Sequence, residues 1–142
     1  MNTIAHILLS FLIGRHFTSD PTLLLVAVLL GNLPDLDHIS HISNAARTGR
    51  FGPGSRSRFH ELYGLSLISV LFVPVALLRH ELLFLYYPLL SHYLADFLTR
   101  PTRPLYPVNS AEMHGSIYPR SFFWMSFADV LVTLVLFAGV LL

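Results

Sequence analysis

The chain has 142 residues, of which 54% are hydrophobic and only 12% are charged, and its mean hydropathy is +0.61. Because so few charged residues are available to cover a water-soluble fold of this size, the composition favours a bilayer environment. The absence of cysteine excludes disulfides, thiolate metal sites and cysteine nucleophiles. The formal net charge of +1 indicates no particular partner. We expect a lipid bilayer as the partner, and no nucleic acid.

Apolar segments follow one another along a chain without internal repeats, which predicts one membrane-embedded domain over residues 1–142. We expect five helices, over Thr3–Phe17, Pro21–Leu33, Leu62–Leu78, Leu82–Leu98 and Ser121–Leu142. The first two fall short of the roughly 20 residues that span a hydrocarbon core, and they cross only if tilted or shielded. The last segment runs apolar after Asp129 and is the most convincing span. The predicted fold class is all-α, a multi-pass membrane bundle of about five helices.

Most of the arginines lie in two polar loops. Ser40–Ser57 is rich in Ser, Gly, Arg and Asn, and Arg100–Arg120 contains four prolines, so neither is expected to form a long helix. If all five segments cross, seven of the nine basic residues lie on one side and only Arg15 and Arg79 on the other. The positive-inside rule then places the arginine-rich loops in the cytoplasm of an inner-membrane protein.

The densest polar motif lies where the second apolar segment ends, in Gly31–His38. It places Asp35, Asp37 and His38 at a membrane boundary, where such groups are costly unless water, protons or a cation compensates them. A solvated helix end with an Asp cap is the alternative interpretation. This motif therefore indicates a metal site only together with other donors.

Further donors lie in the other segments. His92 and Asp96 are four residues apart and share one helix face, which suits either a metal or a simple intrahelical hydrogen bond. His60 precedes Glu61 at the start of the third segment, and a surface histidine is its plainer interpretation. His6 lies in the first segment, where a lone histidine more often packs against another helix.

The convergence of these motifs favours a metal site. With the helices alternating in direction, four segments deliver their ionisable residues to one membrane face: His6, Asp35, Asp37, His38, His60, His92 and Asp96. Nitrogen and oxygen donors gathered in this way predict a divalent-metal site. Of the remaining histidines, we expect His16, His41 and His80 to be solvated at loop edges, and His114 to cap the site from the second loop.

These motifs resemble those of the membrane-bound, metal-dependent hydrolases also described as LexA-regulated inner-membrane hydrolases. The resemblance rests on Ala5-His6, the Gly-x-Leu-Pro-Asp-x-Asp-His block at Gly31–His38, Arg-x-x-x-His at Arg56–His60, and Ser-His-x-x-x-Asp-x-x-Thr at Ser91–Thr99, followed by the Pro-bearing stretch Leu105–Pro107. It implies a multi-pass helical protein that binds zinc or a similar ion through the seven residues named above. The chain departs from the family's His-Arg-Gly-x-x-His-Ser pattern, with Ser55 in place of the first histidine and Glu61 in place of the serine.

The sequence therefore predicts an enzyme, a membrane-embedded metal-dependent hydrolase whose site faces the cytoplasm. Zinc is the expected ion, with manganese or magnesium as alternatives, and it would lower the pKa of a water. Glu61 is the candidate base, and Arg56 is placed to clamp an anionic group. Seven donors exceed one tetrahedral zinc, so either two ions bind or some donors only support the ligands. A phospholipase-like reaction on a lipid-like or other small phosphoester is expected; the alternative is a non-catalytic metal protein with a structural, sensor or transport role.

Overall fold

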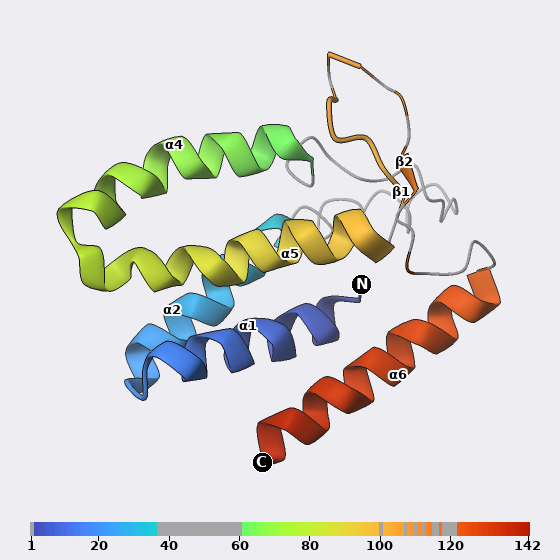
Figure 1. The fold of residues 1–142 in the computed structure, drawn as a ribbon, viewed down its shortest axis with the longest axis horizontal. Helices are drawn as coiled ribbons and strands as arrows, with labels where there is room; N and C mark the ends of the chain where they lie inside the picture. Colours follow the sequence, from blue (N-terminus) through green and yellow to red (C-terminus); the bar gives the residue numbers. More distant parts are fainter. Residues whose placement is uncertain are drawn as a thin grey trace.

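The computed structural model describes residues 2–36, 61–99, 101–106, 108–109, 111, 113–114, 117 and 122–142. Within these ranges the regular structure is helical apart from one pair of two-residue strands (Figure 1). The α-helices are α1 (Thr3–Phe17), α2 (Pro21–Gly31), α4 (Leu62–Leu78), α5 (Tyr86–Thr99) and α6 (Phe122–Leu141). The short elements are the 3-10 helices η1 (Leu33–Leu36) and η3 (His80–Leu85) and the antiparallel strands β1 (Pro101–Thr102) and β2 (Met113–His114).

The predicted helices agree closely with the described ones. α1 and α4 have the predicted bounds, whereas the fourth segment starts as the 3-10 helix η3 and becomes α-helical only at Tyr86. Pro88 explains this difference, because its ring would clash with the carbonyl of Phe84 in a continuous α-helix, while proline is tolerated in a helix's first turn. The second segment likewise ends its α-helix at Gly31 and continues as η1. The all-α prediction is confirmed for the described residues.

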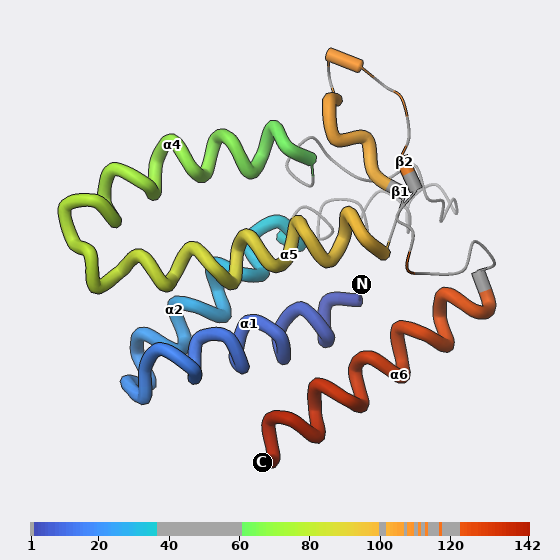
Figure 2. The backbone as a smooth tube through the Cα atoms, in the orientation of Figure 1, coloured from blue at the N-terminus to red at the C-terminus, as the bar shows by residue number. Residues whose placement is uncertain are grey.

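The helices alternate in direction along the chain, which Figures 1 and 2 show from the colour gradient. The starts of α1, α4 and α6 and the ends of α2 and α5 lie at the same end of the bundle as β1 and β2 (Figure 1). We call this the strand end. The opposite end carries the turn from α1 to α2 and the connection from α4 to α5. This alternation is the arrangement on which the predicted convergence of polar residues depends.

Small residues bring α1, α2 and α5 close together. Ala5 and Ala27 are fully buried, and a Cβ added to Gly14 would lie 3.0 Å from that of Ala27. A Cβ on Gly31 would overlap both Ser10 of α1 and Pro88 of α5. Small side chains of this kind allow helix backbones to approach closely in membrane bundles. These three helices therefore form the packed centre on which the candidate site is built.

α6 lies along α1 and is mostly exposed. Its Phe123–Leu141 stretch is the single described helical stretch long and apolar enough to cross a membrane, and only 6% of it is buried. This agrees with the prediction that the last segment is the most convincing span. Hydrogen bonds at both ends of α1 hold α6 to it. Asn2 Nδ2 donates to Thr133 Oγ1 at 3.1 Å, and Arg15 Nη1 donates to the Val140 carbonyl at 3.1 Å.

The turn between α1 and α2 is short and fully capped. Asp20 is the N-cap of α2, and its Oδ1 accepts hydrogen bonds from the backbone of Thr22 at 2.7 Å and Leu23 at 3.1 Å. Thr18 Oγ1 accepts from the Asp20 amide at 3.1 Å. Pro21 follows at the first helical position, where a missing N–H costs nothing. Local sequence signals therefore set this antiparallel pair of helices.

Candidate functional site

Two histidines and an aspartate meet near the strand end. His6 and His92 are each 1% exposed and Asp96 is 3% exposed. His6 Nε2 lies 3.1 Å from Asp96 Oδ1, and the rings of His6 and His92 stack with their centroids 3.8 Å apart. One potential ligand atom from each of the three residues lies within 4.8 Å of the others. Residues far apart in sequence thus form one buried polar group, which we call the His-Asp cluster.

The cluster depends on the register of α5 against α1. His92 and Asp96 lie one turn apart on the α5 face that also buries Pro88 and Leu89. Asp96 reaches across to His6 of α1, so this aspartate does more than bond within its own helix. His6 therefore packs against another helix, which is the simpler interpretation of a lone histidine in the sequence. It also contributes a ring nitrogen to the cluster.

Asp35 approaches the cluster from η1. Its Oδ1 lies 3.7 Å from His92 Nε2, with the aspartate side chain 9% exposed. Asn32 ends α2 by donating from Nδ2 to the Val28 carbonyl at 2.8 Å, and the Asp35 amide then donates to the Asn32 carbonyl at 3.0 Å. Gly31 lets this helix end approach α1 and α5. The Gly-x-Leu-Pro-Asp motif therefore has a local structural role, because it ends α2 and places the Asp35 side chain close to His92.

Several predicted site residues lie outside the described residues. These are the predicted ligands Asp37, His38 and His60 and the predicted anion clamp Arg56, together with His41. The side chain of His114 is likewise outside them. Their predicted roles stay predictions. His16 and His80 are exposed, in agreement with the expectation that they are solvated.

Glu61, the candidate base, is buried at the start of α4. It is 5% exposed, and its Oε2 accepts a hydrogen bond from the Arg103 amide at 3.0 Å. Glu61 sits at the N-cap position of α4 but makes no side-chain cap hydrogen bond there. Its carboxylate therefore ties the beginning of α4 to the stretch after β1, on the α4 side of α5.

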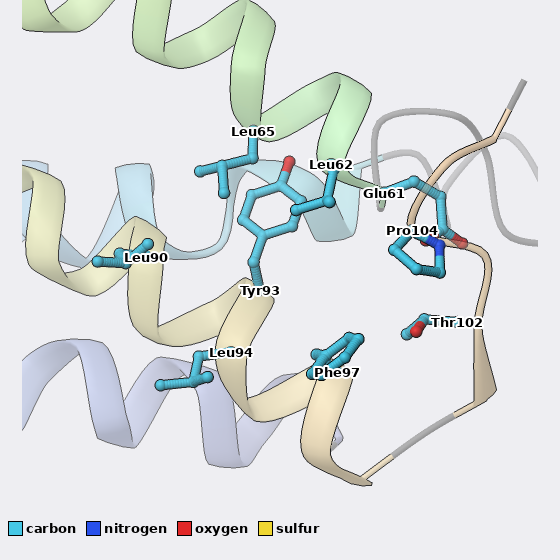
Figure 3. Close-up of a pocket in the computed structure, with 9 residues that line it drawn as sticks. All are labelled: Glu61, Leu62, Leu65, Leu90, Tyr93, Leu94, Phe97, Thr102 and Pro104. Carbon is cyan, nitrogen blue, oxygen red and sulfur yellow. The ribbon is translucent and has the colours of Figure 1, made fainter. Parts of the chain in front are cut away.

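A pocket of about 280 Å³ lies between α4 and α5 and was not anticipated from the sequence (Figure 3). Its walls are Glu61, Leu62, Leu65, Leu90, Tyr93, Leu94, Phe97, Thr102 and Pro104. Tyr93 also meets the His-Asp cluster, because its ring packs edge-on against that of His92 with centroids 5.9 Å apart. The signal that could have revealed this wall is the helical spacing of Leu90, Leu94 and Phe97 on a face different from that of His92.

The cluster contains donors that could hold a divalent ion, and its three ligand atoms, which lie within 4.8 Å of one another, would move closer together on binding one. Atoms that bind one tetrahedral zinc at about 2.0–2.1 Å lie roughly 3.3 Å from one another. The His6–Asp96 distance of 3.1 Å and the His92–Asp35 distance of 3.7 Å bracket this value. His6 Nδ1 makes no hydrogen bond within the described part of the chain, so one imidazole nitrogen of this buried group has no partner there. Imidazole nitrogens and carboxylate oxygens are donors that zinc and manganese both accept.

The chain matches the model of the YdjM inner membrane protein family over residues 1–141. It belongs to that family. The protein is therefore an inner-membrane protein, and a lipid bilayer is its environment. No curated protein and no solved structure was found to match the chain. The family match gives the location of this YdjM-family protein, and its chemistry has to be argued from the cluster itself.

Proposed function

We propose that this inner-membrane protein is a metal-dependent hydrolase. Its ion would be held by His6, His92 and Asp96, with Asp35 as a further ligand or support. The observation that supports this proposal is the meeting of three almost fully buried donors from α1 and α5 within 4.8 Å. Buried ionisable groups in a membrane bundle are costly unless a partner or a cation compensates them. Zinc is the proposed ion, with manganese or magnesium as alternatives, and Asp37, His38 and His60 are proposed to complete the site.

The roles of the side chains follow from their contacts. When bound, a divalent ion supplies Lewis acidity, which polarises a phosphoryl or carbonyl oxygen and lowers the pKa of water. Asp96 fixes the ring of His6 through the 3.1 Å contact, and Asp35 Oδ1 lies 3.7 Å from His92 Nε2. Glu61 is the proposed proton acceptor, and Arg56 is proposed to hold an anionic part of the substrate. The strand end thus supplies the donors and the proposed base, and Arg56 is proposed to add a positive charge.

The proposed substrate is a lipid-like or other phosphoester taken from the cytoplasmic side. The orientation is supported by arginine placement: Arg15 and Arg79 lie toward the opposite end of the bundle, whereas Arg103 follows β1 at the strand end (Figure 1). Arginine-rich loops face the cytoplasm in most membrane proteins. The α-helical alternation supports a multi-pass protein in which the cluster lies near the cytoplasmic headgroups.

A structural ion is the second candidate, and near-complete burial favours it. Exposures of 1%, 1% and 3% for His6, His92 and Asp96 leave little surface for a substrate to reach. Structural zinc sites are closed, while catalytic sites keep an open coordination position. In that case the ion would hold α1 to α5 and catalyse nothing.

Elemental mass spectrometry of detergent-purified protein, prepared without chelator, tests both candidates. We expect one or two zinc or manganese ions per chain, lost in His92→Ala and Asp96→Ala and retained in the control His80→Ala, whose side chain is exposed at the opposite end. Hydrolysis of p-nitrophenyl phosphate and of phospholipid vesicles is then measured with and without added metal. Metal-dependent turnover supports the hydrolase, and bound metal without turnover supports a structural ion. Folded wild-type protein without metal would overturn both.

A further inference from the structure

The pocket between α4 and α5 combines apolar walls with one unsatisfied polar group. Its lining is mostly hydrocarbon, with oxygen atoms from the Tyr93 hydroxyl beside Leu65 and, at the strand end, from Glu61 and Thr102 (Figure 3). The Glu61 carboxylate accepts a hydrogen bond from the Arg103 amide. Thr102 is 5% exposed, and its Oγ1 makes no hydrogen bond within the part of the chain that the structure describes. Since buried hydroxyl groups are normally hydrogen-bonded, this one points to a ligand atom in the pocket.

The apolar part of the pocket opens toward the surface of the bundle. Leu90 and Leu94 of α5 are 42% and 56% exposed, and Leu62 of α4 is 46% exposed. In an inner-membrane protein, an apolar bundle surface of this kind faces lipid chains. A volume of about 280 Å³ is at the lower end for small-molecule sites, so it suits one hydrocarbon chain better than a whole two-chain lipid.

The pocket and the His-Asp cluster share α5. Tyr93 forms a wall of the pocket and extends toward Leu65 of α4 (Figure 3), while its ring edge meets His92 of the cluster. The polar end of the pocket, at Thr102, lies at the strand end, where the cluster also lies. A molecule with its chain between α4 and α5 would therefore have its polar group at the end of the bundle that carries the cluster.

We propose that this pocket binds one acyl chain of a bilayer phospholipid, with Thr102 Oγ1 donating a hydrogen bond to the ester carbonyl. The chain lies between Leu62 and Leu65 of α4 and Leu90 and Leu94 of α5. The inference deepens the proposed function, and it rests on that function for the step from bound lipid to substrate. Lipid binding itself requires neither metal nor turnover.

Photo-crosslinking in vesicles tests the pocket. The full chain is reconstituted in phosphatidylethanolamine and phosphatidylglycerol with a trace of phosphatidylglycerol that carries a diazirine in one acyl chain, in the presence of chelator. After irradiation, labelled peptides are quantified by mass spectrometry. We expect labelling of the α4 and α5 pocket walls to fall at least about 5-fold in Leu94→Trp, which fills the pocket. Leu131→Trp on α6 is the matched control, because Leu131 is 53% exposed and Leu94 56% exposed, and it should leave this labelling unchanged.

The Thr102 hydroxyl is tested separately. Thr102→Val should reduce pocket labelling about 5-fold, the effect of one hydrogen bond, while Thr102→Ser keeps the hydroxyl and should restore the labelling.

Leu90→Phe, a smaller change, serves as the second pocket-filling variant if circular dichroism shows that Leu94→Trp does not fold. Labelling spread equally over α6 and the pocket walls, or unaffected by both pocket-filling variants, would overturn the proposal. Pocket labelling, together with no metal in the protein purified without chelator, would leave the lipid site standing and remove the hydrolase. Metal in that preparation without pocket labelling would do the reverse.

Discussion

The two ends of the helical bundle use ionisable side chains in opposite ways. At the strand end, His6, His92 and Asp96 are almost completely buried and contact one another. At the opposite end, Arg79 Nε and Glu81 Oε1 pair at 2.6 Å, but their side chains are 67% and 60% exposed. An exposed pair is solvated and screened, so it stabilises a fold little, whereas buried groups must be compensated. Burial, and not the presence of charge, therefore distinguishes the end with a candidate function.

The middle of the bundle also packs differently from the end opposite the strands. Pro88, one turn before His92 on α5, and Ser10 of α1 touch α2 at Gly31, which leaves no space there for a larger residue. At the opposite end, aromatic rings fill the space between α1 and the start of α5: the Phe17 ring lies 5.8 Å from that of Phe84 and 5.3 Å from that of Tyr87. Adding atoms to a position without space forces the neighbouring helices apart, so the contact at Gly31 should be the more sensitive to substitution.

Metal removal is expected to give the largest difference between the two ends. If free zinc is kept at about 100 times its dissociation constant, chelation should lower the free energy of unfolding by about 3 kcal/mol. Hydrogen exchange measured by mass spectrometry should then accelerate in the amides around His6 and His92 and stay unchanged around Glu81. Equal acceleration at both ends, or none, would contradict a metal at the cluster.

Gly31→Ala should be the most damaging single substitution outside the cluster. The added Cβ overlaps Ser10 and Pro88, so α2 must move away from α1 and α5, at a cost of about 1–3 kcal/mol. Movement of α2 also takes Asp35 away from His92, and bound metal should fall with stability. Gly139→Ala is the control, because its Cβ would meet Leu12 at an ordinary 3.5 Å. Thermal unfolding in detergent distinguishes the two, and equal effects would refute the close-packing argument.

Asp20→Ala tests the opposite end of the bundle, and its expected loss of stability is intermediate in size. It removes the side-chain oxygen that accepts from the amides of Thr22 and Leu23, and such N-cap losses cost about 0.5–2 kcal/mol. The metal content should not change, because the turn lies at the other end from the cluster. Asp20→Asn keeps a capping oxygen and should retain most of the stability. A loss of metal in Asp20→Ala would show that the two ends are coupled.

The smallest expected effect concerns the exposed ion pair. The hydrogen bond from Arg79 lowers the pKa of Glu81 below its usual 4.5. A carboxyl with a lowered pKa in the folded state stabilises the fold above pH 4.5, and this contribution is lost as the pH falls through the folded value. Glu81→Gln should therefore leave thermal unfolding at pH 7 almost unchanged and slightly flatten its dependence on pH below 4.5. A large loss at pH 7 would mean that the pair is not screened by solvent as its exposure indicates.

The sequence predicted the helices and part of the candidate site for identifiable reasons. Apolar runs bounded by polar, glycine or proline residues set α1 and α4, and helical spacing placed His92 and Asp96 on one face. Alternating helix directions then predicted that His6 and Asp35 would approach them. The contact between His6 and Asp96 joins residues 90 apart, and only packing fixes its geometry.

The pocket could not be derived in the same way. Thr102 becomes part of it because the stretch after α5 folds back on α4, where Glu61 accepts from the Arg103 amide. No periodicity within the sequence encodes that contact. The sequence shows that Tyr93 is adjacent to His92. That Tyr93 also forms a wall of the pocket depends on the position of α4, which the sequence does not give. The sequence predicted most of the helical segments, but it did not predict the contacts between them.

The capped turn from α1 to α2 has a consequence for how the protein is made. Because Thr18 and Asp20 accept hydrogen bonds from the amides of Asp20, Thr22 and Leu23, the first two helices can enter the bilayer as a pair with fewer unpaired backbone donors in the turn. His6 is then in place long before its partners, since His92 is synthesised on the order of 10 s later at typical rates of translation. The cluster is therefore closed only when α5 arrives, and its closure marks the completion of correct assembly in the membrane.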